Sequence, residues 1–285
     1  PVIRAMCMFC IQEFRTPEYK VSSSVPSGPY IVNNSTVATV SAGYYSGGGL
    51  NGADVFYTCN QSPASYSPPG WHKFSFIQKA STSPQIQSVS AQASFAGKTD
   101  SNGEHQVAIE FKETDRLNRG PVTISVRADV QDLNRQTINS STSFIVHPSS
   151  LYVGAKSSKY FIRPKDTYPL ELVVTTIAGK PIAHVPISLK AYLLSTKRTG
   201  YKYNTTEELV YDQTVISGLQ PISHNIVFSN GGKHKIVCEI QDENGMTNST
   251  ELITYVFGGL AHTNPTRNIP VESITLIADK ETYQP

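Results

Sequence analysis

One seven-residue pattern occurs twice in this chain and limits the folds that it can adopt. Gln-Asp-x-Asn-x-x-Thr stands at residues 131–137 and again at residues 241–247. Each copy lies between two segments in which apolar and polar residues alternate, at 122–130 and 141–146 and at 234–240 and 249–256. Alternation predicts strands, and the turn residues between them predict a hairpin. Because the hairpin recurs at a domain-sized distance, the sequence predicts tandem copies of one β module.

Length and composition agree with this interpretation. A chain of 285 residues has room for about two domains. Val, Ile, Thr, Ser and Tyr are frequent, and 19 Gly and 18 Pro mark turns. The net charge of +2 is spread along the chain, so we do not expect nucleic acid as the main partner. No apolar run approaches the length that spans a bilayer, so membrane insertion is not expected either.

The predicted fold class is all-β, with tandem antiparallel sandwiches of the immunoglobulin or fibronectin kind. Residues 1–17 are expected to be the last strand of a preceding module with its linker. Residues 18–149 and 150–259 are expected to be complete sandwiches, and residues 260–285 a linker with the first strand of a following module. The strands expected in the first sandwich are 19–25, 35–45, 53–59, 73–78, 90–96, 105–111, 122–130 and 141–146. In the second, we expect a turn and a proline-bearing edge strand at 179–189, a loop around Asn204 and a hairpin turn at 230–233.

Six Asn-x-Ser/Thr sequons favour a secreted or cell-surface protein, although such triplets also arise by chance in a chain rich in Ser and Thr. The candidate glycosylation sites are Asn33, Asn34, Asn60, Asn139, Asn204 and Asn248. The cysteines, Cys7, Cys10, Cys59 and Cys238, are too few for a disulfide scaffold, and their pairing cannot be deduced from the sequence.

For each candidate for catalysis, cofactor binding or metal binding, a structural role explains the residues better than a chemical one. Gly97-Lys98-Thr99 ends like a phosphate loop, but Gln92 stands where the first glycine belongs, so a turn is expected. The histidines, at 72, 105, 147, 184, 224, 234 and 262, form no metal-binding motif, and His234 with Cys238 is only a weak pair. Cys7-x-x-Cys10 has redox spacing without the strand-to-helix context of redox proteins. The acidic turns at 100–103 and 242–245 are expected to be Asx turns. We therefore expect no enzyme activity, no cofactor and no metal.

The segment between Gln61 and Trp71 lies in a long predicted loop and contains the only tryptophan. Tyr66 and Trp71 could stack on a sugar or a peptide there. The favoured alternative is that Trp71 closes one end of a sandwich core.

Several phrases resemble one family. Residues 9–21, Phe-Cys-Ile-Gln-Glu-Phe-Arg-Thr-Pro-Glu-Tyr-Lys-Val, resemble the join between two macroglobulin modules. Residues 97–103, Gly-Lys-Thr-Asp-Ser-Asn-Gly, resemble a turn of those modules, and residues 277–285, Ile-Ala-Asp-Lys-Glu-Thr-Tyr-Gln-Pro, resemble the opening of one. Together with Tyr-Tyr-Ser-Gly-Gly-Gly-Leu at 44–50 and Ser-Pro-Pro-Gly-Trp at 67–71, they are similar to the N-terminal half of the α2-macroglobulin superfamily, in the branch with bacterial members.

This resemblance implies macroglobulin-like sandwiches from a large secreted protein that traps proteases. In such proteins a bait segment is cut, the modules rearrange, and a thioester can couple the protease covalently. The thioester motif Gly-Cys-Gly-Glu-Gln is absent from these residues, and no bait-like stretch is apparent. The leading hypothesis is therefore a structural scaffold segment of a broad-spectrum protease inhibitor. Its implied partners are proteases, through regions outside the segment, and neighbouring modules, with self-assembly left open. The alternative is a surface or matrix assembly protein built from adhesive sandwiches.

Overall fold

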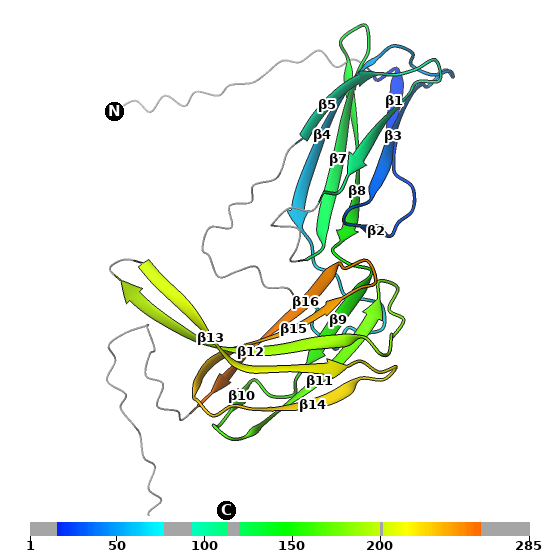
Figure 1. Ribbon diagram of the computed structural model, residues 1–285. Helices are drawn as coiled ribbons and strands as arrows, with labels where there is room; N and C mark the ends of the chain where they lie inside the picture. Colours follow the sequence, from blue (N-terminus) through cyan, green and yellow to red (C-terminus); the bar gives the residue numbers. More distant parts are fainter. Residues whose placement is uncertain (1–15, 77–92, 113–119, 200–201, 258–285) are drawn as a thin grey trace, which may run out of the picture.

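The computed structural model describes residues 16–76, 93–112, 120–199 and 202–257, and every regular element in these ranges is a β-strand (Figure 1). The all-β prediction is therefore confirmed. The first eight strands are β1 (Tyr19–Ser24), β2 (Tyr30–Ile31), β3 (Ser35–Tyr44), β4 (Asp54–Pro63), β5 (Ala93–Lys98), β6 (Glu104–Glu110), β7 (Val122–Gln131) and β8 (Thr137–His147). The next eight are β9 (Leu151–Lys156), β10 (Phe161–Ile162), β11 (Thr167–Thr176), β12 (Pro186–Thr199), β13 (Lys202–Ile216), β14 (Ile222–Val227), β15 (Gly232–Gln241) and β16 (Thr247–Val256).

Each set of eight strands forms a sandwich of a three-stranded and a five-stranded sheet. The first sandwich has the strand orders β1-β3-β6 and β2-β8-β7-β4-β5. The second has the orders β9-β11-β14 and β10-β16-β15-β12-β13, so every strand of the first has its counterpart eight strands later. This identity of strand order confirms the prediction of tandem β modules. The pairing is antiparallel except for the two-residue strands β2 and β10, which pair in parallel with β8 and β16 and were not predicted.

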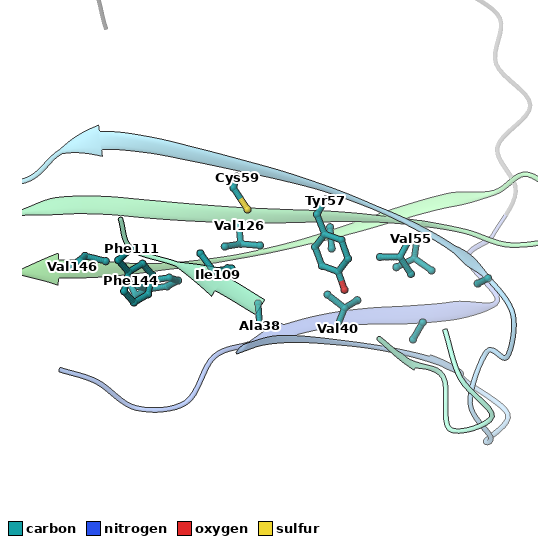
Figure 2. Packing of buried hydrophobic residues seen from close by; sticks show 14 of the residues in the cluster. Ala38, Val40, Val55, Tyr57, Cys59, Ile109, Phe111, Val126, Phe144 and Val146 are labelled. Atoms are coloured by element: carbon teal, nitrogen blue, oxygen red, sulfur yellow. The ribbon is translucent and has the colours of Figure 1, made fainter. Parts of the chain in front are cut away.

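Each sandwich has its own apolar core, which forms because the strands alternate inward apolar and outward polar residues. In the first sandwich, Val40 from one sheet and Val55, Tyr57 and Val126 from the other meet between the sheets (Figure 2). In the second, Leu172, Leu189 and Ile236 do the same. The two cores are separate clusters, so each sandwich buries apolar surface without the other.

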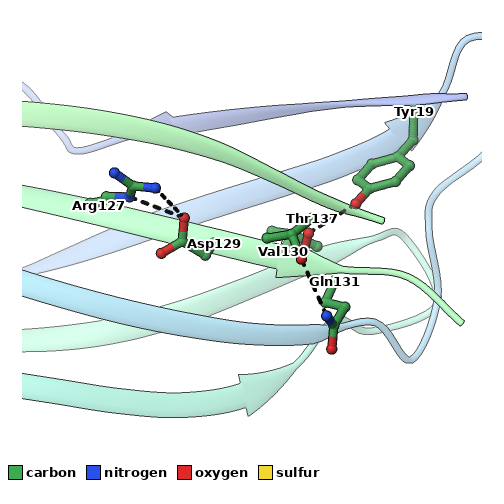
Figure 3. A network of polar contacts seen from close by, with 6 residues as sticks. All are labelled: Tyr19, Arg127, Asp129, Val130, Gln131 and Thr137. Atoms are coloured by element: carbon green, nitrogen blue, oxygen red, sulfur yellow. Dashed lines mark hydrogen bonds and ion pairs between the residues drawn. The ribbon is translucent and has the colours of Figure 1, made fainter. Parts of the chain in front are cut away.

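The repeated pattern forms the β7–β8 and β15–β16 hairpins, as predicted. Its first and last residues are cross-strand partners in both copies, Gln131 with Thr137 and Gln241 with Thr247. The fifth position adopts a positive φ in each, at Arg135 and at Gly245. Figure 3 shows the first hairpin, where Gln131 donates a hydrogen bond to Thr137 and the Tyr19 hydroxyl donates one to the Val130 carbonyl.

Three predictions for the second sandwich are wrong. The strand after residue 179 is not an edge strand, because β12 lies between β13 and β15, and Pro186 is tolerated there as the first residue of the strand. Asn204 lies on the long strand β13 rather than in a loop. The turn at 230–233 joins β14 to β15, which belong to different sheets, so it is not a hairpin turn.

The turn at 100–103 is an Asx turn, as expected, because Oδ1 of Asp100 accepts the amides of Asn102 and Glu104, and it joins strands of different sheets, β5 and β6. One difference concerns the first sandwich. The strand predicted at 73–78 is not formed in its described part, where Ser75 makes a single β-bridge to Ala155 of the second sandwich. The apolar residues that suggested this strand serve the contact between the sandwiches.

Candidate functional site: the junction between the two sandwiches

Residues 64–76 leave the first sandwich at the end of β4 and lie on the second. Alternate residues of β9 and β11 point into the core of the second sandwich, so Tyr152 and Val173 lie on the opposite, outer face of their sheet. Phe76 packs against both, and Tyr152 and Val173 are each 1% exposed. Tyr66, Trp71, Phe74 and Ile177 surround them. The outer face of the three-stranded sheet is therefore an apolar contact surface, and the first sandwich covers it.

Directional hydrogen bonds fix the register of this contact. The Tyr66 hydroxyl donates to the carbonyl oxygen of Ile177 at 2.7 Å, and Nε1 of Trp71 donates to that of Gly179 at 2.9 Å. Ser75 and Ala155 exchange two backbone hydrogen bonds of 2.8 and 3.0 Å. Both aromatic side chains are hydrogen-bonded to the second sandwich. Tyr66 and Trp71 therefore serve this contact and not the ligand contact that the sequence suggested. Trp71 joins two sandwiches instead of offering a stacking surface or closing one core.

Two glycines permit the close approach. A Cβ atom at Gly179, whose φ is +84°, would lie 2.2 Å from the carbonyl oxygen of Pro69. A Cβ at Gly154 would lie 2.6 Å from the ring of Phe76. Both distances are shorter than any real contact of a Cβ atom, so a side chain at either position would push residues 64–76 off the sheet.

The linker between the sandwiches is held by Asp242, the second residue of the repeated pattern. Its Oδ2 accepts hydrogen bonds from the Ser149 hydroxyl and from the amide and hydroxyl of Ser150, at 2.8–2.9 Å. Its Oδ1 accepts bonds from the amides of Asn244 and Met246 and forms the turn. Burial opposes ionisation of this carboxyl, but the hydrogen bonds from Ser150, Met246 and Ser149 outweigh that effect and lower its pKa.

Asp132 occupies the position of Asp242 in the first hairpin and closes its turn in the same way. Its Oδ1 accepts the amide of Gln136 at 2.8 Å, as Oδ1 of Asp242 accepts that of Met246. The sequence pattern identified both aspartates as turn formers, but nothing local to Asp242 signals that it also binds a linker some ninety residues earlier.

A buried imidazole lies where the linker begins. His147 is 5% exposed, and its Nδ1 is 2.7 Å from the Tyr152 hydroxyl. The Tyr66 ring packs edge-on against it, with a centroid distance of 4.6 Å. Desolvation by burial lowers the pKa of His147 to about 4, and burial likewise raises the pKa values of Tyr152 and Tyr66. These groups are therefore neutral at physiological pH, as a packed interface requires.

The sequon at Asn248 proves to be structural. Asn248 is 2% exposed, and its Oδ1 accepts the amide of Val153 at 3.0 Å. Two residues on, the Thr250 hydroxyl donates to the Val153 carbonyl at 2.6 Å. These two side chains of β16 satisfy backbone groups of the edge strand β9. A glycan at Asn248 would not fit in this fold, so Asn248 is removed from the candidate glycosylation sites.

The remaining sequon asparagines, Asn33, Asn34, Asn60, Asn139 and Asn204, are exposed and stay candidates. Asn33 lies at the junction, where its side-chain amide is 3.6 Å from the sulfur of Met246 in the second sandwich. A shallow, polar depression of about 520 Å³ lies beside it, lined by Asn33, Asn34, Ser35, Glu110, Phe111 and Lys112. No histidine or cysteine lines this depression, and it offers no constellation for catalysis.

The other candidates for chemistry have structural roles or lie outside the described residues. Thr99 binds the backbone of Ala53 and Leu50 at a turn, so Gly97-Lys98-Thr99 does not form a phosphate loop. Cys59 and Cys238 are buried free thiols of different sandwiches, and burial raises the pKa of each. Within the described ranges, no three His, Cys, Asp or Glu side chains are grouped to hold a metal ion. Cys7, Cys10 and His262 lie outside those ranges.

The described histidines are likewise dispersed. His105 contacts the Tyr57 hydroxyl, His224 contacts that of Tyr211, and His234 is buried beside Phe228. His72 and His184 are exposed. None of the described segments forms a helix long and apolar enough to cross a membrane.

Comparisons with known proteins agree with this architecture. No protein-family model matches the sequence. The α2-macroglobulin homolog of Nostoc sp. is 22% identical over 291 aligned residues, which cover 97% of this chain. Circularly permutated Ras protein 2 of Dictyostelium discoideum is 27% identical over 159 residues, or 53% of this chain. Among solved structures, Escherichia coli α2-macroglobulin activated by porcine elastase superposes with a TM-score of 0.61 over 88% of this chain, at 12% identity.

The aligned region is a small part of each of these proteins. The chain covers 15% of the Nostoc homolog, 4% of the Dictyostelium protein and 22% of the E. coli structure. The similarity to the Nostoc homolog runs through both sandwiches, and the fold is that of the E. coli α2-macroglobulin over the same span. Through both sandwiches, the chain is therefore similar in sequence to an α2-macroglobulin homolog and shares the fold of tandem macroglobulin-like modules.

Proposed function

We propose that this chain is a structural scaffold segment of a secreted, broad-spectrum protease inhibitor of the α2-macroglobulin kind. Residues 18–149 and 150–259 would be its two complete modules, and the bait and thioester functions would belong to regions outside it. The observation that carries the proposal is the junction, where residues 64–76 and Asp242 hold two sandwiches in one arrangement. A scaffold that must transmit a rearrangement between distant regions needs such fixed joints.

The relatives support the inhibitor role over the adhesive alternative. One solved relative is described as activated by porcine elastase, which is an interaction with a protease. Exposed sequons on both sandwiches are compatible with secretion. No contact or surface in the described residues favours a filament of adhesive units in particular, so the inhibitor scaffold is the function that we put forward.

The experiment is a trapping assay on the full-length protein that contains this segment. After incubation with trypsin, we expect the bound protease to cleave a small chromogenic peptide but not a large protein substrate. The isolated 285-residue chain is the control and should leave both activities unchanged. Equal inhibition of both substrates, or none by the full-length protein, would overturn the proposal.

A further inference from the structure

Four Asn-Gly dipeptides occur in this chain, at residues 51–52, 102–103, 230–231 and 244–245. Each lies between two strands, in the turn positions that this dipeptide favours. The asparagine is exposed in all four. Such a pair is chemically reactive, because the amide nitrogen of the glycine can attack the side-chain amide of the asparagine and glycine has no Cβ atom to hinder the approach. Since the four asparagines are alike in exposure, the state of the glycine amide decides which pair reacts.

In three of the four dipeptides, a backbone hydrogen bond of 3.0 Å holds the glycine amide. The amides of Gly52, Gly103 and Gly245 donate to the carbonyl oxygens of Thr99, Asp100 and Asp242, respectively. All three glycines also have a φ between +73° and +78°, so they share one turn conformation. Attack by such a nitrogen requires that its hydrogen bond breaks and that the turn opens locally. The fold therefore protects these three pairs.

In the Asn230-Gly231 pair, the glycine amide is not held in this way. Among residues 16–76, 93–112, 120–199 and 202–257, no group accepts a hydrogen bond from the amide of Gly231. Gly231 itself is buried, whereas Asn230 is exposed. Buried backbone N–H groups are almost always paired, so this unpaired one is an exception. No turn hydrogen bond within these ranges has to break before the nitrogen of Gly231 approaches Cγ of Asn230.

We propose that Asn230 is the site at which this protein deamidates in its folded state. The nitrogen of Gly231 bonds to Cγ of Asn230, and the proton that this nitrogen loses passes through water to Nδ2. The bond between Cγ and Nδ2 breaks, ammonia leaves, and a succinimide ring joins the two residues. Water then opens the ring at either carbonyl and leaves aspartate or isoaspartate at position 230, so the overall reaction consumes one water and releases one ammonia. The inference goes beyond the scaffold role and does not depend on it.

The place of Asn230 in the fold gives the two products different consequences. Its turn passes from β14 in one sheet to β15 in the other and is fixed on both sides. On one side Phe228 is 2% exposed and its carbonyl accepts the amide of Lys165, and on the other Gly232 pairs with Val256. Aspartate changes only the charge, which falls by one from the net value of +2. Isoaspartate also adds a methylene group to the main chain, so it should destabilise the second sandwich where β15 begins.

The first test compares the four sites within one sample. The folded 285-residue chain is incubated in mildly alkaline buffer, and peptide mapping by mass spectrometry follows each asparagine. We expect Asn230 to react roughly tenfold or more faster than Asn51, Asn102 and Asn244, the factor that corresponds to breaking one backbone hydrogen bond. In urea, where no turn is held, the four rates should become similar. Equal rates in the folded chain, or an Asn230 that stays intact there while the unfolded sample reacts, would overturn the proposal.

The second test examines the protective role of the held turn. Oδ1 of Asp100 accepts the amides of Asn102 and Glu104, so Asp100→Ala should loosen that turn, raise the deamidation rate of Asn102 and leave that of Asn230 unchanged. Asn230→Gln should abolish the fast reaction, because the longer side chain of glutamine disfavours the ring closure. Isoaspartate at position 230 identifies the succinimide route, since direct hydrolysis yields aspartate only. Aspartate alone, or an unchanged rate at Asn102, would contradict the inference, and none of these results bears on the trapping assay.

Discussion

The carboxylate of Asp242 accepts hydrogen bonds from both the amide and the hydroxyl of Ser150, at 2.9 and 2.8 Å, across 92 positions of sequence. One residue of a hairpin turn thereby fixes the chain at the point where it passes from the first sandwich to the second. The same carboxylate closes its own turn through Met246. The turn and the linker are therefore coupled, and the stability of one depends on the other.

Asp242→Asn should destabilise the second sandwich by about 2–4 kcal/mol, because an amide cannot accept the same set of bonds and loses the charge that strengthens them. Asp132→Asn is the matched control in the first hairpin, where the carboxylate accepts the amide of Gln136, and should cost about 1 kcal/mol. Urea unfolding of both variants measures the difference. Equal losses would show that the linker bonds contribute nothing.

Gly179→Ala should loosen the junction, because its Cβ would lie 2.2 Å from the Pro69 carbonyl oxygen. Gly70→Ala separates this effect from backbone strain, since Gly70 has a φ of +85° and nothing within 4 Å of its Cβ position. We expect Gly70→Ala to cost about 1 kcal/mol and Gly179→Ala to cost clearly more. The emission of Trp71, the only tryptophan, reports on the junction directly, and it should shift to the red only in the Gly179 variant.

Acid should weaken the junction in a defined pH window. The pKa of His147 is about 4 in the folded chain against an ordinary value of 6.5, so the unfolded chain binds the proton first as the pH falls. Stability is therefore complete above about pH 6.5, declines toward pH 4, and has lost about 3 kcal/mol below that value. The pKa of Asp242 is also lowered, so its contribution is lost only in more acid solution, as the pH falls below the ordinary aspartate value.

The measurement is the unfolding free energy as a function of pH, with His147→Gln as the comparison. This variant should be less stable at neutral pH but should show a flatter profile between about pH 6.5 and pH 4. His234 is also buried with a lowered pKa, so some slope should remain. NMR titration of the histidines gives an independent check, and a normal pKa for His147 would contradict the expectation.

Expression in a host that glycosylates secreted proteins should modify exposed sequons such as Asn139 and Asn204 but leave Asn248 free, because Asn248 is buried. Glycopeptide mass spectrometry measures this occupancy. Asn248→Ala should also cost about 1–3 kcal/mol by leaving the Val153 amide without its acceptor. Asn139→Ala, on an exposed strand position, should change stability by less than about 0.5 kcal/mol. A glycan on Asn248 in folded protein would contradict the structure.

Local sequence is enough to specify most of the longer strands, the two hairpins and their repetition, because these depend on alternation and on turn residues that are close together in the chain. The amino-acid pattern alone therefore places Gln131 and Gln241 at equivalent hairpin ends, and the strand pairing confirms this. The resemblance to macroglobulin modules rests on similarly local phrases.

The way in which the sandwiches are joined depends instead on tertiary contacts. The partners of Asp242, Asn248 and Trp71 lie about 90–110 residues away from them, and no local pattern distinguishes an aspartate that closes a turn from one that also holds a linker. The same limit explains why the sequence predicts a strand at residues 73–78, which is not formed in its described part, and a glycosylation site at Asn248, which is buried. An apolar run or a sequon shows only which side chains are present. Whether those side chains are buried depends on which surface the rest of the chain packs against them.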